Sequence, residues 1–150
     1  MSEVKKILCS CLGNSDRSPV MRAQLELMLR NQGTEGIEII SAGVLDSAKS
    51  GGGAPDLSIS IAPTYGIDLS THRKQHISSL DLGSFDLVIA ADKEVQAELM
   101  GAGVKAEIIC LELNGASNAW KAQNPRKVED MFHSIHNALL REVISYKFRK

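Results

Sequence analysis

Four short apolar runs along the chain have the length and composition of β-strands. They are bounded by polar or glycine-containing turns, and they cover residues 4–10, 37–41, 85–91 and 106–113. The third run, Phe85-Asp86-Leu87-Val88-Ile89-Ala90-Ala91, is almost continuous in apolar residues. Such a run is typical of a strand that is covered on both of its faces. The pattern therefore predicts a sheet with a strand buried between two layers.

Between these runs, apolar residues recur every three or four positions, as on one face of a helix. The predicted helices cover residues 18–33, 57–65, 94–100 and 128–143. Ser18 is a good N-cap for the first of them, and Pro19 suits its first turn. Strands that alternate with helices predict a doubly wound α/β fold with a parallel sheet. At 150 residues, the chain is expected to form a single domain over residues 1–150.

The composition is ordinary, with 43% hydrophobic residues, 23% charged residues and a formal net charge of -1. This balance gives no electrostatic footprint for nucleic acid or for an anionic membrane surface, so neither is an expected partner. No apolar run approaches the length of a membrane span, and the one before Cys11 is too short for a secretory signal. We therefore expect a cytoplasmic protein, either a monomer or a weak dimer.

Three cysteines do not suggest a disulfide framework. Cys9 and Cys110 lie in apolar runs and are expected to be small buried residues. His72 and His76, like His133 and His136, have a spacing that could face a metal, but no ligand-rich segment completes such a site. We expect no metal and no organic cofactor.

The segment from Cys11 to Arg17 has the composition of an oxyanion receptor. It follows the first predicted strand and precedes the first helix, at the edge of the sheet where ligands bind in such folds. Backbone N–H groups of the loop and of the first helical turn would converge there, and the helix dipole favours negative charge. Arg17 adds a bidentate fork for phosphate oxygens, and the same field would stabilise a thiolate on Cys11. The sequence thus predicts a phosphate-binding loop with a cysteine nucleophile.

Residues 11–19, Cys-Leu-Gly-Asn-x-x-Arg-Ser-Pro, resemble the signature loop of the low-molecular-weight protein tyrosine phosphatases. The resemblance continues through residues 41–43, 65–75 and 85–92, roughly the first hundred residues of the chain. It implies a three-layer α/β fold, in which helices flank a four-stranded parallel sheet. It also implies a phosphomonoester hydrolase, a protein phosphatase acting on phosphotyrosine, that works through a cysteinyl-phosphate. Its partner would be a phosphorylated protein or a small aryl phosphate.

The resemblance also assigns roles to individual residues. Cys11 would be the nucleophile, Arg17 the clamp on the phosphate, and Ser18 the hydroxyl that stabilises the thiolate. The residues around the phosphate would be Leu12, Gly13, Asn14, Ser15, Asp16 and Arg17. A hydrogen-bond network that supports the loop would consist of Asn14, Ser41 and His72. Asn14 would adopt a left-handed conformation, which asparagine tolerates better than most residues.

The sequence departs from the family pattern at two single positions and in its substrate wall, where the family's aromatic residues are missing. Asp16 stands where the family has a second cysteine, and a carboxylate there should weaken anion binding through repulsion. We expect it to turn away and pair with a basic side chain. Asn124, before Pro125, stands at the position of the family's general acid, and an amide cannot donate a proton in that role. General acid–base catalysis is worth roughly two to four orders of magnitude, so we expect low activity, measurable on aryl phosphates.

Alternatives remain at several of these positions. Asn124 could simply cap the last helix, with Pro125 in its first turn, and Asp92 and Asp130 are fallback acids. The segment 44–53 has no aromatic residue, so Trp120 could supply a replacement rim for the substrate or could be a core anchor.

Two other functions also remain open. The chain could be an impaired module that binds phosphate or a phosphorylated partner without turnover. A more distant resemblance is to arsenate reductases, whose chemistry needs two further cysteines where this chain has none, between Cys11 and Cys110.

Overall fold

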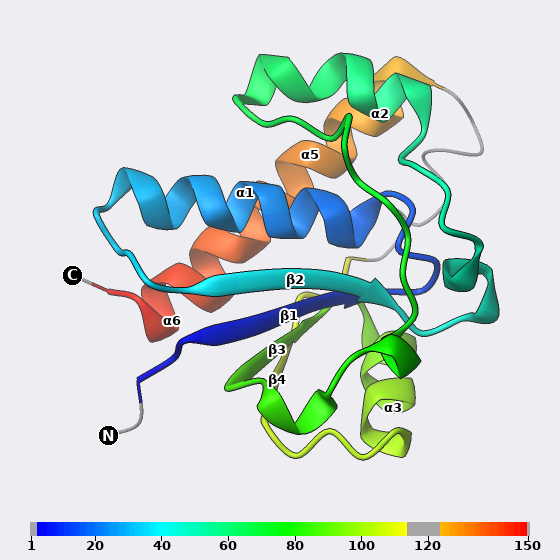
Figure 1. Cartoon of the computed structure of the whole chain (residues 1–150). Helices are drawn as coiled ribbons and strands as arrows, with labels where there is room; N and C mark the ends of the chain where they lie inside the picture. Colours follow the sequence, from blue (N-terminus) through cyan, green and yellow to red (C-terminus); the bar gives the residue numbers. More distant parts are fainter. Residues whose placement is uncertain (1–2, 114–123, 150) are drawn as a thin grey trace.

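The computed structural model describes residues 3–113 and 124–149, and it contains a sheet of four parallel strands (Figure 1). The strand order is β2-β1-β3-β4. The strands are β1 Lys6–Cys11, β2 Glu38–Gly43, β3 Leu87–Ala90 and β4 Glu107–Cys110. Every neighbouring pair is parallel. The predicted parallel α/β sheet is therefore confirmed.

Helices cover both faces of this sheet, giving three layers (Figure 1). The α-helices are α1 Arg17–Asn31, α2 Asp56–Ile61, α3 Lys93–Gly101, α5 Pro125–Leu139 and α6 Ser145–Lys147. A π-helical turn at Leu140–Ile144 joins the last two. The 3-10 turns are Asp46–Ser50, Ala62–Tyr65, Ile77–Ser79 and Leu82–Ser84. Helices α1, α2 and α5 lie on one face, and α3 lies on the other. None of the helices in the described ranges is long and apolar enough to cross a bilayer.

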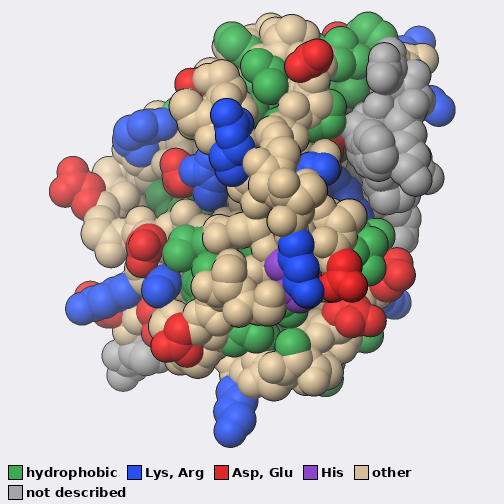
Figure 2. All heavy atoms as spheres, turned by 45° about the vertical axis from the view of Figure 1, so that its right-hand side comes forward, with side chains coloured by type: hydrophobic (Ala, Val, Ile, Leu, Met, Phe, Trp, Pro, Cys, Tyr) green, Lys and Arg blue, Asp and Glu red, His purple; other side chains and the backbone are tan. Residues whose placement is uncertain are grey.

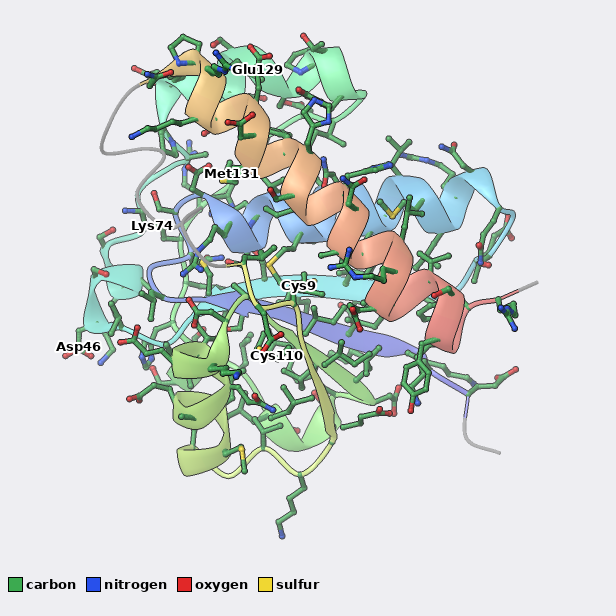
Figure 3. The ribbon with its side chains drawn as sticks, turned by 180° about the vertical axis from the view of Figure 1, so that it is seen from behind. Cys9, Asp46, Lys74, Cys110, Glu129 and Met131 are labelled. Carbon is green, nitrogen blue, oxygen red and sulfur yellow. The ribbon has the colours of Figure 1, made fainter. Side chains whose placement is uncertain are left out.

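The central strand β1 shows why the sheet is covered on both sides. Its side chains alternate between the two faces, and they are buried on each. Ile7 and Cys9 join the core formed with α1 and α5, to which Met131 also belongs; Figure 3 labels Cys9 and Met131. Leu8 joins the core against α3. Cys9 is fully buried, as predicted, and burial raises the pKa of its thiol far above the ordinary value. Cys110 is only half-buried, because it ends β4 at the edge of the sheet, so the prediction for it is wrong.

The order of the strands fixes where a ligand could bind. The chain leaves β1 through α1 to β2 on one side, and it later returns to β3 on the other side of β1. A parallel α/β sheet has its switch point where the order reverses, here beyond the carboxyl ends of β1 and β3. The loop after β1 and the residues after β3 therefore meet at one place.

The start of α1 differs from the prediction. The helix begins at Arg17, with Asp16 in the N-cap position, and the Asp16 side chain makes no capping hydrogen bond. Pro19 lies in the first turn, as expected, but Ser18 is inside the helix and is not its cap. The Ser18 hydroxyl is instead engaged with the sulfur of Cys11.

Candidate functional site

Cys11 is the last residue of β1, and its sulfur is held by two neighbours, one from the loop that follows and one from the first turn of α1. The Ser18 hydroxyl oxygen lies 3.0 Å from Cys11 Sγ, and the backbone N–H of Asn14 donates to the same sulfur at 3.3 Å. The Ser18 oxygen itself accepts a hydrogen bond from Asn14 Nδ2 at 2.8 Å, so its own hydrogen is available for the sulfur. This arrangement provides two donors to a sulfur that would carry negative charge as a thiolate.

Asn14 is the centre of the hydrogen-bond network under the loop. Its φ angle is 55°, in the left-handed region, and its side chain is fully buried. Besides Ser18, its Nδ2 donates to Ser41 Oγ at 3.0 Å, and its Oδ1 accepts from the backbone N–H of Gln75 at 2.8 Å. A residue in a sparsely populated conformation persists only where its surroundings fix it. These bonds fix Asn14 from two different segments of the chain.

His72 supports Asn14 through its backbone carbonyl. Its Nε2 lies 2.6 Å from the carbonyl oxygen of Asn14, and because a carbonyl only accepts, Nε2 must carry the hydrogen. Burial lowers the pKa of His72, and the nearby charges of Arg22, Lys74 and Arg73 lower it further, against the opposing effect of the Asn14 bond. The lowered pKa favours the neutral imidazole, with its hydrogen on Nε2. The structure thus brings together the three residues expected to support the loop.

Arg17 forms a buried ion pair that the sequence did not predict. Its Nη1 lies 2.8 Å from Oδ2 of Asp92, and the two side chains are only 5% and 16% exposed. The other carboxylate oxygen of Asp92 accepts from the backbone N–H of Val95 at 2.9 Å, which caps α3. Asp92, which lies between β3 and α3, therefore holds the Arg17 guanidinium from the other strand of the switch point. Its place directly after the third apolar run is the signal that could have identified it.

Asp16 turns away from the sulfur, but not toward a basic side chain. Its Oδ1 accepts a hydrogen bond from Ser58 Oγ of α2 at 2.7 Å, and the residue is 3% exposed. Among the described residues, its Oδ2 is buried without a hydrogen-bond partner. The expectation of a basic partner is wrong, because the loop places Asp16 against α2, which offers only a hydroxyl there. Burial raises the pKa of Asp16, and the bond from Ser58 and the charge of Arg17 lower it.

The loop lies directly against β2 at Gly43. A Cβ on Gly43 would lie 2.7 Å from the carbonyl oxygen of Leu12 and 2.9 Å from the backbone nitrogen of Asn14. The oxygen of Leu12 also accepts from the N–H groups of Val44 and Leu45, each at 2.9 Å. Only glycine leaves room for this approach. The half-buried residues Leu12, Gly13 and Ser15 complete the loop.

The expected general-acid position is occupied by a helix cap. Asn124 Oδ1 accepts from the backbone N–H groups of Arg126 at 3.0 Å and Lys127 at 3.4 Å, and Pro125 is the first residue of α5. The expected rim residue Trp120 lies outside the described residues. In the described part of the chain, no group of three His, Cys, Asp or Glu side chains could hold a metal ion.

Comparisons with known proteins show what this chain is similar to. A family model for the low molecular weight phosphotyrosine protein phosphatase matches residues 6–146. The probable low molecular weight protein-tyrosine-phosphatase EpsP of Ralstonia nicotianae is 33% identical over 96 residues, which are 64% of this chain and 61% of that protein. Low molecular weight phosphotyrosine protein phosphatase 1 of Drosophila melanogaster is 30% identical over 111 residues, 72% of this chain and 70% of that protein.

The fold is also that of solved structures. The crystal structure of Primo-1 superposes with a TM-score of 0.82 at 23% identity, covering 97% of this chain and all of the other. At this identity the likeness concerns the fold alone. The segment aligned with the Ralstonia relative spans less than two thirds of that protein's length.

Proposed function

Because the chain belongs to the low molecular weight phosphotyrosine protein phosphatase family, we propose that it hydrolyses phosphate monoesters through a cysteinyl-phosphate on Cys11. The observation that carries this proposal is the pair of donors on the Cys11 sulfur, from the Ser18 hydroxyl and the Asn14 N–H. A cysteine that serves only as a small buried residue does not require such donors. A thiolate nucleophile does.

The reaction would proceed in two displacements. The Cys11 thiolate attacks phosphorus, the S–P bond forms, and the P–O bond to the leaving group breaks, so that the alkoxide or phenolate departs with the electron pair and takes its proton from water. Arg17 and the loop N–H groups would bind the phosphoryl oxygens as charge builds on them. Water then attacks phosphorus, the S–P bond breaks, and inorganic phosphate leaves, with the Ser18 hydroxyl stabilising the returning thiolate.

The first displacement would lack a strong general acid. Asn124 stands at the acid's position by resemblance, and an amide cannot protonate the departing oxygen. A phenol with a low pKa leaves without protonation, whereas tyrosine and aliphatic alcohols need it. We therefore propose an activity that is measurable on activated aryl phosphates and weak on phosphotyrosine. A phosphorylated protein remains the proposed class of physiological substrate.

Hydrolysis of p-nitrophenyl phosphate tests the proposal, with Cys11→Ser as the inactive comparison. We expect turnover by the native chain and none above background for Cys11→Ser, which keeps the shape of the site. A denaturing gel after brief incubation with radiolabelled aryl phosphate should show label on the native protein and none on the variant. Equal turnover by the two proteins would exclude a cysteinyl-phosphate.

A binding module is the second candidate, and the cap formed by Asn124 favours it. The Asn124 side chain accepts hydrogen bonds from two backbone N–H groups of α5. This cap accounts for the asparagine without any role in catalysis. A binding module would take up phosphate without turning over any ester. Phosphate binding by calorimetry, measured beside the turnover assay, separates the two functions.

A further inference from the structure

Asp16 is a buried titratable group for which the proposed reaction has no use. It lies one residue before Arg17, inside the loop that would surround the anion, and it is 3% exposed. One hydroxyl, from Ser58, donates to Oδ1, while Oδ2 has no partner among the described residues. An ionised carboxylate has room for about four donors, and burying the charge with a single donor is costly. The protonated form carries no charge to bury.

The charged neighbours do not compensate for an ionised Asp16. Arg17 is the one charged group among the described residues that shifts the pKa of Asp16, and it lowers it. Nη1 of its guanidinium also pairs with Asp92 at 2.8 Å, so the charge of Arg17 is shared with a second carboxylate. The hydrogen bond that α2 donates to Asp16 comes from the neutral hydroxyl of Ser58. Burial, which raises the pKa of Asp16, is the largest effect.

We propose that Asp16 and Ser58 form a proton-dependent latch: the loop binds an oxyanion when the Asp16 carboxyl holds a proton and releases it when that proton is lost. This inference rests on the proposed binding of an oxyanion in the loop. A bound dianion adds negative charge next to Asp16, which favours the protonated carboxyl. By linkage, anion binding and proton binding strengthen each other. Asp16 would then be a positioning residue, acting on affinity rather than on the reacting atoms.

The structural part of the latch is the bond between the loop and α2. Ser58 is fully buried on α2, and Asp16 is the N-cap residue that precedes α1. Ionisation would place a charge with one donor between these two helices. Separation of α2 from the loop, with entry of water, is the simplest way to solvate that charge. The loop would then lose its support on this side at higher pH.

Sulfate binding to Cys11→Ser tests the latch, because sulfate keeps its charge over the whole pH range and the serine removes the titrating thiol. Affinity is measured by calorimetry from pH 4.5 to 8.5 in Cys11→Ser and in Cys11→Ser/Asp16→Asn. The amide is a neutral isostere of the protonated carboxyl. His72 titrates in both proteins, so its contribution cancels in the ratio of the two affinities.

We expect the affinity of Cys11→Ser for sulfate to fall with rising pH relative to that of the double variant. The expected change is about tenfold for each unit by which sulfate raises the pKa of Asp16. Calorimetry in two buffers of different ionisation enthalpy should show proton uptake on binding that the double variant lacks. A constant affinity ratio and equal proton uptake would overturn the latch. Absence of sulfate binding in both proteins at every pH would instead overturn the proposed anion site.

Ser58→Ala keeps the test valid if Asp16→Asn fails to fold. Removing the one donor to Oδ1 destabilises the carboxylate further, so in Cys11→Ser/Ser58→Ala the fall in affinity should move to higher pH. An unmoved transition would contradict the latch.

Discussion

The Arg17 guanidinium and the Asp92 carboxylate meet at 2.8 Å across the switch point of the sheet, where the loop after β1 faces the start of α3. The same carboxylate caps α3 through the N–H of Val95. One side chain thus fixes both the direction of the guanidinium and the end of a helix. The ion pair with Arg17 needs the charge of Asp92, whereas the cap of α3 needs only an oxygen that accepts a hydrogen bond. Substitutions can therefore separate the two interactions.

Asp92→Asn removes the charge and keeps the cap, since asparagine caps helices about as well as aspartate. We expect its rate on p-nitrophenyl phosphate to fall about tenfold or more, because the Arg17 guanidinium loses the carboxylate that holds its direction, and misplacement of a binding group lowers the rate. Because the cap is kept, this variant should lose no stability at the start of α3. Asp92→Ala should lose the same activity and about 1 kcal/mol more stability. Urea unfolding and turnover measured on both variants check this. Full activity in Asp92→Asn would show that Arg17 is positioned without it.

The close approach of the loop to β2 predicts that Gly43 cannot be replaced. In Gly43→Ala the new Cβ would lie 2.7 Å from the Leu12 carbonyl oxygen, so the backbone of the loop must move. We expect at least a tenfold loss of turnover and a loss of about 1–3 kcal/mol in stability, the usual range for overpacking.

Gly101→Ala is the matched control for this substitution. No atom lies within 4 Å of the added Cβ, at the end of α3. This variant should keep its activity and gain up to about 1 kcal/mol from helix propensity. Normal turnover in Gly43→Ala would contradict the account of the loop.

Sequence periodicity revealed the strands and helices because each is a local pattern. The contact between Cys11 and Ser18 could also be predicted, since the two residues lie only seven positions apart. Asp92 and Ser58 were not recognised as partners of the loop, because they lie 75 and 42 positions from Arg17 and Asp16. Apolar runs do not specify the order of strands, and only that order places the residues after β3 beside the loop. The expectation that Asp16 pairs with a basic side chain was wrong for the same reason, because its partner Ser58 lies far away in the sequence.

The stability of the chain should depend on the protonation of His72. Burial lowers the pKa of His72, so the unfolded chain, in which histidine titrates near about 6.5, binds the proton more readily. The free energy of unfolding should therefore fall as the pH drops from the ordinary value of histidine through the lowered value. His72→Gln can still donate to the Asn14 carbonyl, and it should lose this part of the pH dependence.

Unfolding by urea at several pH values between 5 and 8 measures the effect. His136, which is exposed on α5, provides the control: His136→Gln should keep the pH dependence of the native chain. Identical pH profiles for His72→Gln and the native chain would show that the buried imidazole is not responsible.

The cap of α5 provides the most direct test of the weak acid step. Asn124→Asp keeps an acceptor for the N–H groups of Arg126 and Lys127, so the helix should begin as before. If position 124 is that of the general acid, the new carboxyl can protonate the departing oxygen. We expect turnover to rise by about tenfold or more, within the range of roughly two to four orders of magnitude that such catalysis supplies.

The leaving group and a second substitution make this test specific. The gain should be larger for phenyl phosphate than for p-nitrophenyl phosphate, because the poorer leaving group depends more on protonation. It should also be larger near pH 5 than near pH 8, since a carboxyl at a helix N-terminus is readily ionised. Asn137→Asp adds the same charge to an exposed site further along α5 and should change nothing. An equal effect of the two substitutions, or none from Asn124→Asp, would mean that the acid's position lies elsewhere in the chain.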